Sequence, residues 1–580
     1  MLKLIVGREE MPQINKSFHL LFLGDTGKAG GAQCSALGWW GKDAKMHIIL
    51  VDFGMGYIDQ GTRIIPDINA LATLVNIVIE AIVVTHIHGD HIGGIEWFLQ
   101  SFLKPGTKAV VNLSPRVQIV GLPSTIEFLK SQLGRVPTIA QFIAGGRFLA
   151  LEPYQPALVC PKKDEPVLIT GYPTVHTTLG SAGVLISHLN QGWSVFLTGD
   201  FAQFERLPSQ ATAVVFDATA ADKPGYGLRE EDSLDRLANV FQSNSGSRLI
   251  FAVPPRDLAK VKIALEAGAR AGRKYYCVLG EPLARNIEIF QRYFCDVSMT
   301  RLDYQDFLGI ENNLGLLFTL PSELDPNAAA MLEFKSSDMV FMEFPNNDDV
   351  TFDETVSWLK ERVQGVLYPR QNSSFFPSHA HILDIGNLLR EITYSVAIPY
   401  QGDQGTHEFV KDWLQRQRIC GSPRYDIKTG VAEISEPICQ LIFPHAWFSL
   451  QWDEEAGHWF FPLKLEYVLG VPALLREQSL VKYPLKRVSV KFPAPVNGDF
   501  FSLRGLKVLV DCGKNGSAGL WPQLRTLIIA MAYKVCREFD YSKDSNILQL
   551  AVKEYLGKFL PVFAQWETGP QINVEILEGR

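Results

Sequence analysis

The sequence lacks several features that would place it in a specialised class of protein. Its eight cysteines include no C-x-x-C pair and no close spacing, so neither a zinc knuckle nor a disulfide framework is indicated. The longest apolar stretch, residues 74–84, is interrupted by Asn76 and Glu80 and is too short to span a bilayer. The apolar start at residues 1–6 is too brief for the core of a signal peptide. We therefore expect a cytoplasmic protein with reduced cysteines and no membrane partner.

The chain also lacks an excess of positive charge. Its net charge of −7 argues mildly against nucleic-acid binding, because basic residues are the usual signature of phosphate binding. Divalent cations in a cleft would nevertheless hold a phosphate whatever the overall charge. With 580 residues, 47% of them hydrophobic and 20% charged, the chain is expected to form several units that each bury a core.

Hydrophobic periodicity divides the chain into regions of different character. Over the first two hundred residues, strand-like runs alternate with Gly-rich turns, and segments such as 92–103 have helical spacing, which indicates sheets covered by helices. Between about 215 and 385, longer helical stretches alternate with strands, as in a second α/β unit. Beyond about 440 the chain is rich in aromatic residues and prolines. We expect a connecting region at 441–490 and a small C-terminal α/β domain at 491–580.

The densest group of ligand-type residues is T-H-I-H-G-D-H at residues 85–91. In an extended segment alternate residues point the same way, so His86 and His88, after the strand-like run 81–85, would converge on one ion. The turn at Gly89 directs Asp90 and His91 toward a neighbouring position, where a second ion would sit. The alternative, that these are surface or helix-cap histidines, fits poorly with four ligand-type residues in six positions.

Three more positions are candidates for the same site. His176 follows the strand-like segment 167–172 and Asp200 ends the run 195–199, so both lie at strand exits, where ligands gather. Asp52, in another such run, is equally well explained as a turn residue. Histidine and carboxylate ligands without thiolates suit Zn²⁺ or Mn²⁺ in an open, water-containing site. Two such ions about 3.5 to 4 Å apart activate a shared water, so the residues indicate a hydrolase.

The order of these residues resembles a known family. The aspartate at 52, the cluster at 85–91, the histidine at 176 and the aspartate at 200 match the four successive motifs of the metallo-β-lactamase superfamily. The neighbouring sequence resembles its β-CASP nuclease branch, in particular ribonuclease J. F-D-A-T-A-A-D-K-P-G at 216–225 is similar to the family's S-D-S-T-N-A-E-R-P-G, which places Asp217 at an acidic motif. P-S-H-A at 377–380 is similar to S-G-H-A, which places His379 at a second motif.

The resemblance implies a fold of the α/β class. An αββα metallo-β-lactamase sandwich would be formed by residues 1–215 and 386–440, with a β-CASP α/β domain inserted at 216–385 and the small α/β domain at the C-terminus. The implied activity is hydrolysis of phosphodiester bonds in RNA or single-stranded DNA. The family also implies a homodimer formed through the C-terminal domain.

The resemblance further implies a role for each residue of the site. One ion would be bound by the imidazoles of His86, His88 and His176. The other would be bound by Asp90 and His91, and Asp200 would bridge the two ions. Asp52 would orient the ligands by hydrogen bonding, with Asp217 also behind them. His379 would contact the scissile phosphate or protonate the leaving oxygen, so that Asp90, Asp200 and His379 act in catalysis. Ser378, His379 and Lys28, in a Gly-rich loop, would meet the substrate.

This sequence departs from the family's pattern at two informative places. Gln401 stands where the third β-CASP motif has a His that ligates the second ion, and an amide oxygen is a poorer zinc ligand than an imidazole. His407 is close enough in sequence to substitute, although it also fits a solvated residue at a helix start. Ser378 replaces a glycine before His379, where backbone would approach phosphates. We therefore expect two Zn²⁺ ions per chain, the second bound more weakly, with Mn²⁺ or Mg²⁺ as alternatives.

Three functional classes follow from these residues. The leading prediction is a two-metal nuclease that cleaves RNA or single-stranded DNA by metal-activated water. The alternative is a binding or scaffold subunit that keeps the fold and has weak or no turnover because of Gln401. A small ester or lactam hydrolase is less favoured, because such a substrate does not need an inserted domain of about 170 residues. A basic group in the inserted domain would line a nucleic-acid groove or form a solvated helical face; it consists of Arg256, Arg270, Arg273 and Lys274.

Overall fold

The computed structural model describes most of the first four hundred residues and scattered segments after them. The described residues are 17–24, 31–43, 45–57, 63–66, 77–103, 112–160, 166–294, 296–311, 314–324, 332–342, 350–368 and 375–402, followed by a few single residues and short strands up to residue 576.

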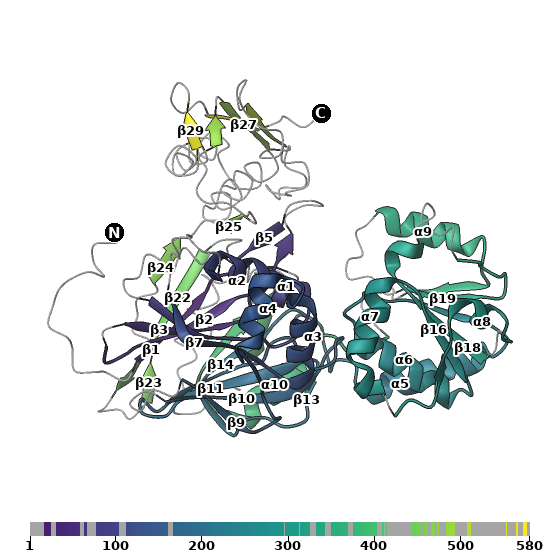
Figure 1. The fold of residues 1–580 in the computed structure, drawn as a ribbon, viewed down its shortest axis with the longest axis horizontal. Helices are drawn as coiled ribbons and strands as arrows, with labels where there is room; N and C mark the ends of the chain where they lie inside the picture. The colour runs from purple at the N-terminus through teal and green to yellow at the C-terminus, as the bar shows by residue number, and fades with distance from the viewer. Residues whose placement is uncertain are drawn as a thin grey trace.

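Two β-sheets pack face to face and form the body of the first unit, which we call the sandwich (Figure 1). The first sheet has the order β23-β22-β1-β2-β3-β6-β7-β8, with β24 paired to β22. Its strands are β1 (Ser17–Phe22), β2 (Ser35–Trp40), β3 (Met46–Val51), β6 (Ile77–Val83), β7 (Asn112–Gly121), β8 (Phe148–Ala150), β22 (Pro444–Asp453), β23 (His458–Phe460) and β24 (Glu466–Leu469).

The second sheet has the order β13-β10-β11-β12-β14-β21, with β9 paired to β10. Its strands are β9 (Pro156–Cys160), β10 (Val167–Val175), β11 (Ala182–His188), β12 (Trp193–Leu197), β13 (Gln203–Phe204), β14 (Gln210–Asp217) and β21 (Thr393–Tyr400).

Strand β3 illustrates why the sequence forms layers. Successive side chains of a strand point to opposite faces, and both faces of β3 are apolar. Ile48 and Leu50 pack toward the helices, whereas Ile49 and Val51 pack toward the second sheet, and all four are buried. A continuous apolar run of this kind indicates a strand covered on both sides.

Helices cover the outer faces of both sheets. On the first sheet lie α1 (Gly89–Ile92), α2 (Ile95–Leu103), α3 (Pro123–Leu133) and α4 (Pro137–Ala144), and on the second lies α10 (Ile382–Glu391). Apolar residues at helical spacing face the sheets, for example Phe98 and Leu99 of α2 and Ile385 and Leu389 of α10. The resulting order, helix, sheet, sheet, helix, is the αββα arrangement that the family resemblance implied.

A second α/β unit, which we call the inserted unit, lies beside the sandwich (Figure 1). Its sheet has the order β17-β16-β18-β15-β19-β20 and is parallel throughout its described pairs. The strands are β15 (Leu249–Ala252), β16 (Tyr275–Val278), β17 (Thr300–Arg301), β18 (Gly315–Thr319), β19 (Met339–Met342) and β20 (Gly365–Leu367). The helices are α5 (Glu230–Ser243), α6 (Leu258–Arg270), α7 (Glu281–Ile289), α8 (Tyr304–Leu308) and α9 (Val350–Lys360).

The chain leaves the sandwich and returns to it through neighbouring strands. β14 and β21 pair in parallel, from Gln210 with Thr393 to Asp217 with Tyr400. The inserted unit is therefore a long crossover between two adjacent strands of one sheet. The predicted boundary at 385/386 falls inside α10, which packs on the second sheet of the sandwich.

Within the expected connecting region at 441–490, the structure describes strands that belong to the first sheet of the sandwich. Strand β22 pairs with β1, with Ser17 opposite Gln451, and thereby extends the first sheet. Trp447 and Phe448 of this aromatic stretch thus lie in a strand of the sandwich. Three short strands, β27 (Arg487–Phe492), β28 (Lys507–Asp511) and β30 (Ile572–Ile576), form a separate small sheet. Most of the predicted C-terminal domain, and with it the predicted dimer contact, lies outside the described residues.

Within the described part of the chain, no helix has the length and apolar character needed to cross a membrane.

Candidate metal centre

Loops at the ends of three strands bring the first group of ligands together. His86 and His88 follow β6, His176 follows β10, and Asp200 follows β12. His88 Nδ1 lies 3.1 Å from His86 Nε2 and 3.2 Å from His176 Nε2. Asp200 Oδ2 lies 3.8 Å from the Nε2 atoms of His86 and His176. The structure therefore brings together the three histidines that the resemblance assigned to one ion and the aspartate that it assigned as the bridge, with one ligand-type atom of each within 4.8 Å of the others.

The outward-facing nitrogens of two of these imidazoles have partners that fix their protonation. His176 Nδ1 lies 2.6 Å from the carbonyl oxygen of Ser378, which can only accept a hydrogen bond. His86 Nδ1 lies 3.0 Å from Thr85 Oγ1, and that hydroxyl donates its own proton to Asp52 Oδ2 at 2.8 Å. Both imidazoles are consequently donors at Nδ1, which leaves a lone pair on each Nε2.

The third imidazole is fixed in the opposite sense. His88 Nε2 lies 3.0 Å from Asp257 Oδ1, so in the neutral ring Nε2 donates and the lone pair is on Nδ1. With all three imidazoles neutral, as metal ligation requires, three lone pairs face one another across 3.1–3.2 Å. Such an arrangement is repulsive unless a cation lies among the nitrogens, and it fits a divalent metal with nitrogen and carboxylate ligands.

Burial keeps the first group in the form that binds metal. It lowers the pKa of His86 and of His176 well below the ordinary value, and neighbouring imidazoles lower both further. Both rings are nearly inaccessible, with exposed fractions of 0% and 4%. Metal ligation requires neutral imidazole, so no proton has to be removed from these two residues near neutral pH.

A second group shares the Asp200 carboxylate with the first. His91 Nε2 lies 3.2 Å from Asp200 Oδ1 and 3.8 Å from Asp90 Oδ2. On the other side of the ring, His91 Nδ1 lies 2.7 Å from Asp52 Oδ2. Asp52 also accepts from the backbone N–H of Thr85 at 2.8 Å, so its carboxylate orients His91 as the resemblance implied. The three ligand atoms of Asp90, His91 and Asp200 lie within 4.8 Å of one another.

The second group binds a proton tightly when it holds no ion. Burial by itself lowers the pKa of His91, but the carboxylates of Asp200 and Asp52 raise it well above its ordinary value. A cation at His91 Nε2 would displace that proton, so ion binding at this group releases protons and strengthens as the pH rises.

Gln401 borders the second group at the position where the resemblance has an imidazole. Its Nε2 donates to Asp200 Oδ1 at 2.7 Å and lies 3.4 Å from His91 Nε2, while its Oε1 accepts from Thr219 Oγ1 at 2.9 Å. A carboxylate only accepts, so the amide nitrogen must face Asp200 and the amide oxygen must face away. Gln401 is 1% exposed and has a φ of +61°, a conformation rare for a residue other than glycine.

A histidine–aspartate pair also lies near Asp200. His379 Nδ1 is 2.7 Å from Asp217 Oδ2, at the end of β14. Burial lowers the pKa of His379, but the Asp217 carboxylate outweighs it and raises that pKa to about 9. One ligand-type atom from each of Asp200, Asp217 and His379 lies within 4.8 Å of the other two. A protonated imidazole is therefore held beside the first group.

Some predicted residues are not placed at the site. Lys28 and His407 lie outside the described residues, so their predicted roles stay predictions. The structure shows Ser378 contributing its backbone carbonyl to His176, a contact distinct from the predicted meeting with substrate.

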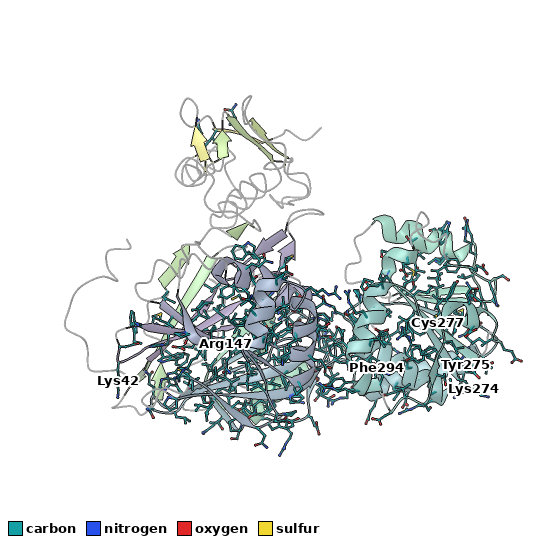
Figure 2. The ribbon with its side chains drawn as sticks, viewed as in Figure 1. Lys42, Arg147, Lys274, Tyr275, Cys277 and Phe294 are labelled. Carbon is teal, nitrogen blue, oxygen red and sulfur yellow. The ribbon has the colours of Figure 1, made fainter. Side chains whose placement is uncertain are left out.

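The four basic residues of the predicted groove do not share one face. Arg273 is buried and donates to the carbonyl oxygens of Ser247 and Asn244, and Arg270 pairs with an exposed aspartate. In the view of Figure 2, Lys274 lies at the end of the inserted unit that is remote from the sandwich. Of the four, Arg256 lies beside the site. Its Nη1 is close to Gly89, between His88 and Asp90, since a Cβ added at Gly89 would lie 3.4 Å from it.

Asp257 is the residue of the site that sequence reasoning missed. It lies 169 positions from His88, immediately before helix α6, where an aspartate ordinarily indicates a helix cap. No periodicity or spacing connects it with the histidine cluster, so only the packing of the inserted unit on the sandwich reveals the contact. Thr85 was noted only as the first residue of the cluster, although its hydroxyl links His86 to Asp52.

Comparisons with known proteins indicate one superfamily. Residues 44–111 match the family model of the metallo-beta-lactamase superfamily. The chain is 24% identical to ribonuclease J2 of Bacillus subtilis strain 168 over 285 residues, which cover 44% of this chain and 46% of the relative. It is 22% identical to ribonuclease J of Helicobacter pylori strain J99 over 419 residues, which cover 65% and 55%. The chain thus spans about half the length of the curated relatives it matches.

Among solved structures, a protein of unknown function from Enterococcus faecalis V583 aligns with 66% of this chain and 94% of its own, at 14% identity and a TM-score of 0.42. The family-model match and the weak similarity to the two ribonucleases, together with the clustered His and Asp side chains, support a divergent ribonuclease J-like member of the metallo-β-lactamase superfamily.

Proposed function

We propose that this metal-dependent hydrolase is a nuclease that cleaves phosphodiester bonds, with RNA as the favoured substrate and single-stranded DNA as the second. One observation carries the proposal: Asp200 belongs to a group of converging imidazole lone pairs and also lies beside the protonated His379–Asp217 pair. Phosphodiester hydrolysis needs both parts, a cation at the phosphoryl group and an acid for the leaving oxygen. The names of the two ribonuclease relatives favour RNA.

The first group would hold a Zn²⁺ ion, with Mn²⁺ or Mg²⁺ as alternatives. Such an ion would polarise the phosphoryl group and lower the pKa of water. The chain's own residues would do the rest: Asp90 and Asp200 accept hydrogen bonds from the attacking water and orient it. His379, kept protonated by Asp217, gives a proton to the departing oxygen. A second ion at the Asp90–His91–Asp200 group would be bound more weakly, because Gln401 already donates to Asp200.

End-labelled substrates test this proposal directly. RNA with a 5′-monophosphate, a 5′-triphosphate or a 5′-hydroxyl, and single-stranded DNA, are incubated with the full chain and Zn²⁺ or Mn²⁺. We expect cleavage by the wild type and a loss of roughly 10²- to 10⁴-fold in rate for His379→Ala. His381→Asn is the matched control, because it removes a neighbouring imidazole at the start of α10 and keeps a residue that caps helices well. If the metal-loaded protein leaves all four substrates intact, the proposal fails.

The contact between Gln401 and Asp200 favours a second candidate, a binding or scaffold subunit with little turnover. Metal content and RNA binding separate the two functions. Rapid cleavage that is lost in Asp90→Ala supports the nuclease, whereas unimpaired RNA binding without cleavage, at one ion or none per chain, supports the scaffold.

A further inference from the structure

The inserted unit supplies a carboxylate to the first metal group. Asp257 Oδ1 lies 3.0 Å from His88 Nε2, on the side of the ring opposite the converging lone pairs. Its other oxygen lies 2.8 Å from Lys260 Nζ, and both side chains are 11% exposed. Asp257 stands at the N-cap of α6, yet its side chain makes no cap hydrogen bond there. The carboxylate is therefore directed at His88 and Lys260 instead of at its own helix.

Backbone contacts hold this carboxylate in place from both units. The N–H of Asp257 donates to the carbonyl of Pro254 at 3.0 Å, and Asn286 Nδ2 of α7 donates to the carbonyl of Pro255 at 2.7 Å. Across the junction between the inserted unit and the sandwich, the N–H of Ala259 in α6 donates to the carbonyl of Thr177 at 3.1 Å. Thr177 directly follows the ligand His176, so the junction between the two units passes through the metal group.

Other contacts show that the same junction is packed and not incidental. Arg292 of the inserted unit forms a 2.9 Å ion pair with Glu127 on α3. Phe290 lies against Phe128 of that helix with ring centroids 6.1 Å apart. Two exposed charges add little free energy, but the aromatic contact buries apolar surface on both sides.

A carboxylate behind a ligating imidazole fixes the ring's tautomer and orientation and makes the facing nitrogen a better donor to metal. We propose that Asp257 is a positioning residue through which docking of the inserted unit on the sandwich and metal binding at the His86–His88–His176–Asp200 group stabilise each other. The inference rests on the metal group of the proposed function and adds its regulation. Because linkage is reciprocal, a metal ion tightens the junction by the same factor by which the docked junction tightens the metal.

The first measurement is the Zn²⁺ affinity of the full chain, obtained by competition with a chelator of known affinity. We expect Asp257→Ala to weaken binding by about 10- to 100-fold, the usual effect of losing such a carboxylate. Asp257→Asn restores part of the loss, since its amide oxygen still accepts from His88. Lys260→Met changes the affinity by less than about threefold, because it leaves the carboxylate in contact with the ring. Asp235→Asn is the matched control on the surface of the same unit, where the carboxylate is 73% exposed.

The second measurement is hydrogen exchange of the Ala259 amide, which crosses the junction. We expect slower exchange with Zn²⁺ than without it in the wild type, and loss of this difference in Asp257→Ala. A Zn²⁺ affinity of Asp257→Ala equal to that of the wild type overturns the inference. A wild-type exchange rate of the Ala259 amide that is the same with and without Zn²⁺ overturns it as well. Equal losses of affinity in Lys260→Met and Asp257→Ala would also refute it, because general damage to α6 would then explain both. A wild type that binds no Zn²⁺ refutes the proposed function as well, whereas normal metal binding without linkage refutes this inference alone.

Discussion

Replacement of Gln401 by histidine is expected to convert the Asp90–His91–Asp200 group into a strong ion site. In the wild type, an ion that uses Asp200 Oδ1 must displace the 2.7 Å hydrogen bond from Gln401 Nε2. A hydrogen bond to a charged group contributes about 1.5–3 kcal/mol. Displacing this hydrogen bond therefore weakens binding of the second ion by about 10- to 150-fold, because about 1.4 kcal/mol corresponds to a factor of ten in affinity. Gln401→His removes that competitor and supplies an additional nitrogen ligand.

The backbone conformation at residue 401 should affect the wild type and the Gln401→His variant equally. Gln401 has a φ of +61°, and glutamine and histidine both carry a Cβ, so the strain of this conformation is similar in the two proteins. Gln401→Leu separates the two contributions, because it removes the amide N–H without adding a ligand. We expect the affinity for the second ion to rise from the wild type to the leucine variant and again to the histidine variant.

Native mass spectrometry against a graded series of chelator concentrations measures this order. The wild type should retain one Zn²⁺ ion per chain at chelator levels that leave two in Gln401→His. Equal retention of two ions by both proteins would refute the reasoning, since the amide would then offer no competition for Asp200. Affinity for the first ion should change little, because His86, His88 and His176 are untouched.

Three further predictions concern groups around the site and in the cores. Asp217→Asn removes the carboxylate that raises the pKa of His379 against the effect of burial, so that pKa should fall from about 9 and the cleavage rate should fall by roughly 10²-fold or more. Nuclear magnetic resonance titration measures the pKa and the pH–rate profile measures the rate; an unshifted pKa contradicts the role given to Asp217. Asp338→Ala removes the two hydrogen bonds of 2.6 and 3.1 Å that buried Arg248 donates to that carboxylate, and should lower the free energy of unfolding by about 3–5 kcal/mol. Denaturant titration measures the change, and a value below about 1 kcal/mol speaks against a buried pair. Burial lowers the pKa of His188 to about 4, below the unfolded value of 6.5, so protonation of His188 costs no stability above pH 6.5 and lowers the free energy of unfolding as the pH falls from 6.5 toward 4. His188→Leu should reduce that loss by no more than about 3 kcal/mol, and an unchanged pH dependence of the free energy of unfolding would exclude His188 as a cause.

Local pattern predicted the elements with good accuracy wherever one face or both faces of an element are apolar. The helical spacing at 92–103 and the strand-like segment at 167–172 correspond to α2 (Ile95–Leu103) and β10 (Val167–Val175). Alternation of side chains shows that a strand exists but not which strand it pairs with. Pairing of β22 with β1 joins residues more than four hundred positions apart, and this pairing depends on the whole sandwich.

Candidate ligands that lie close together in the chain or at strand exits can be found from the sequence alone. His86, His88, Asp90 and His91 occupy six positions after one strand, so strand alternation and the following turn suffice to direct them. Two neighbouring sheets that end at one edge then bring in His176 and Asp200.

How those candidate ligands are held depends on contacts that form only when the chain is folded. The contact of Asp257 with His88 spans 169 residues and requires the inserted unit to dock on the sandwich. The direction of the Gln401 amide likewise depends on Asp200 on one side and Thr219 on the other. A hydrogen bond acts over about 3 Å between atoms that the chain order does not relate, so residue type and spacing carry no record of it.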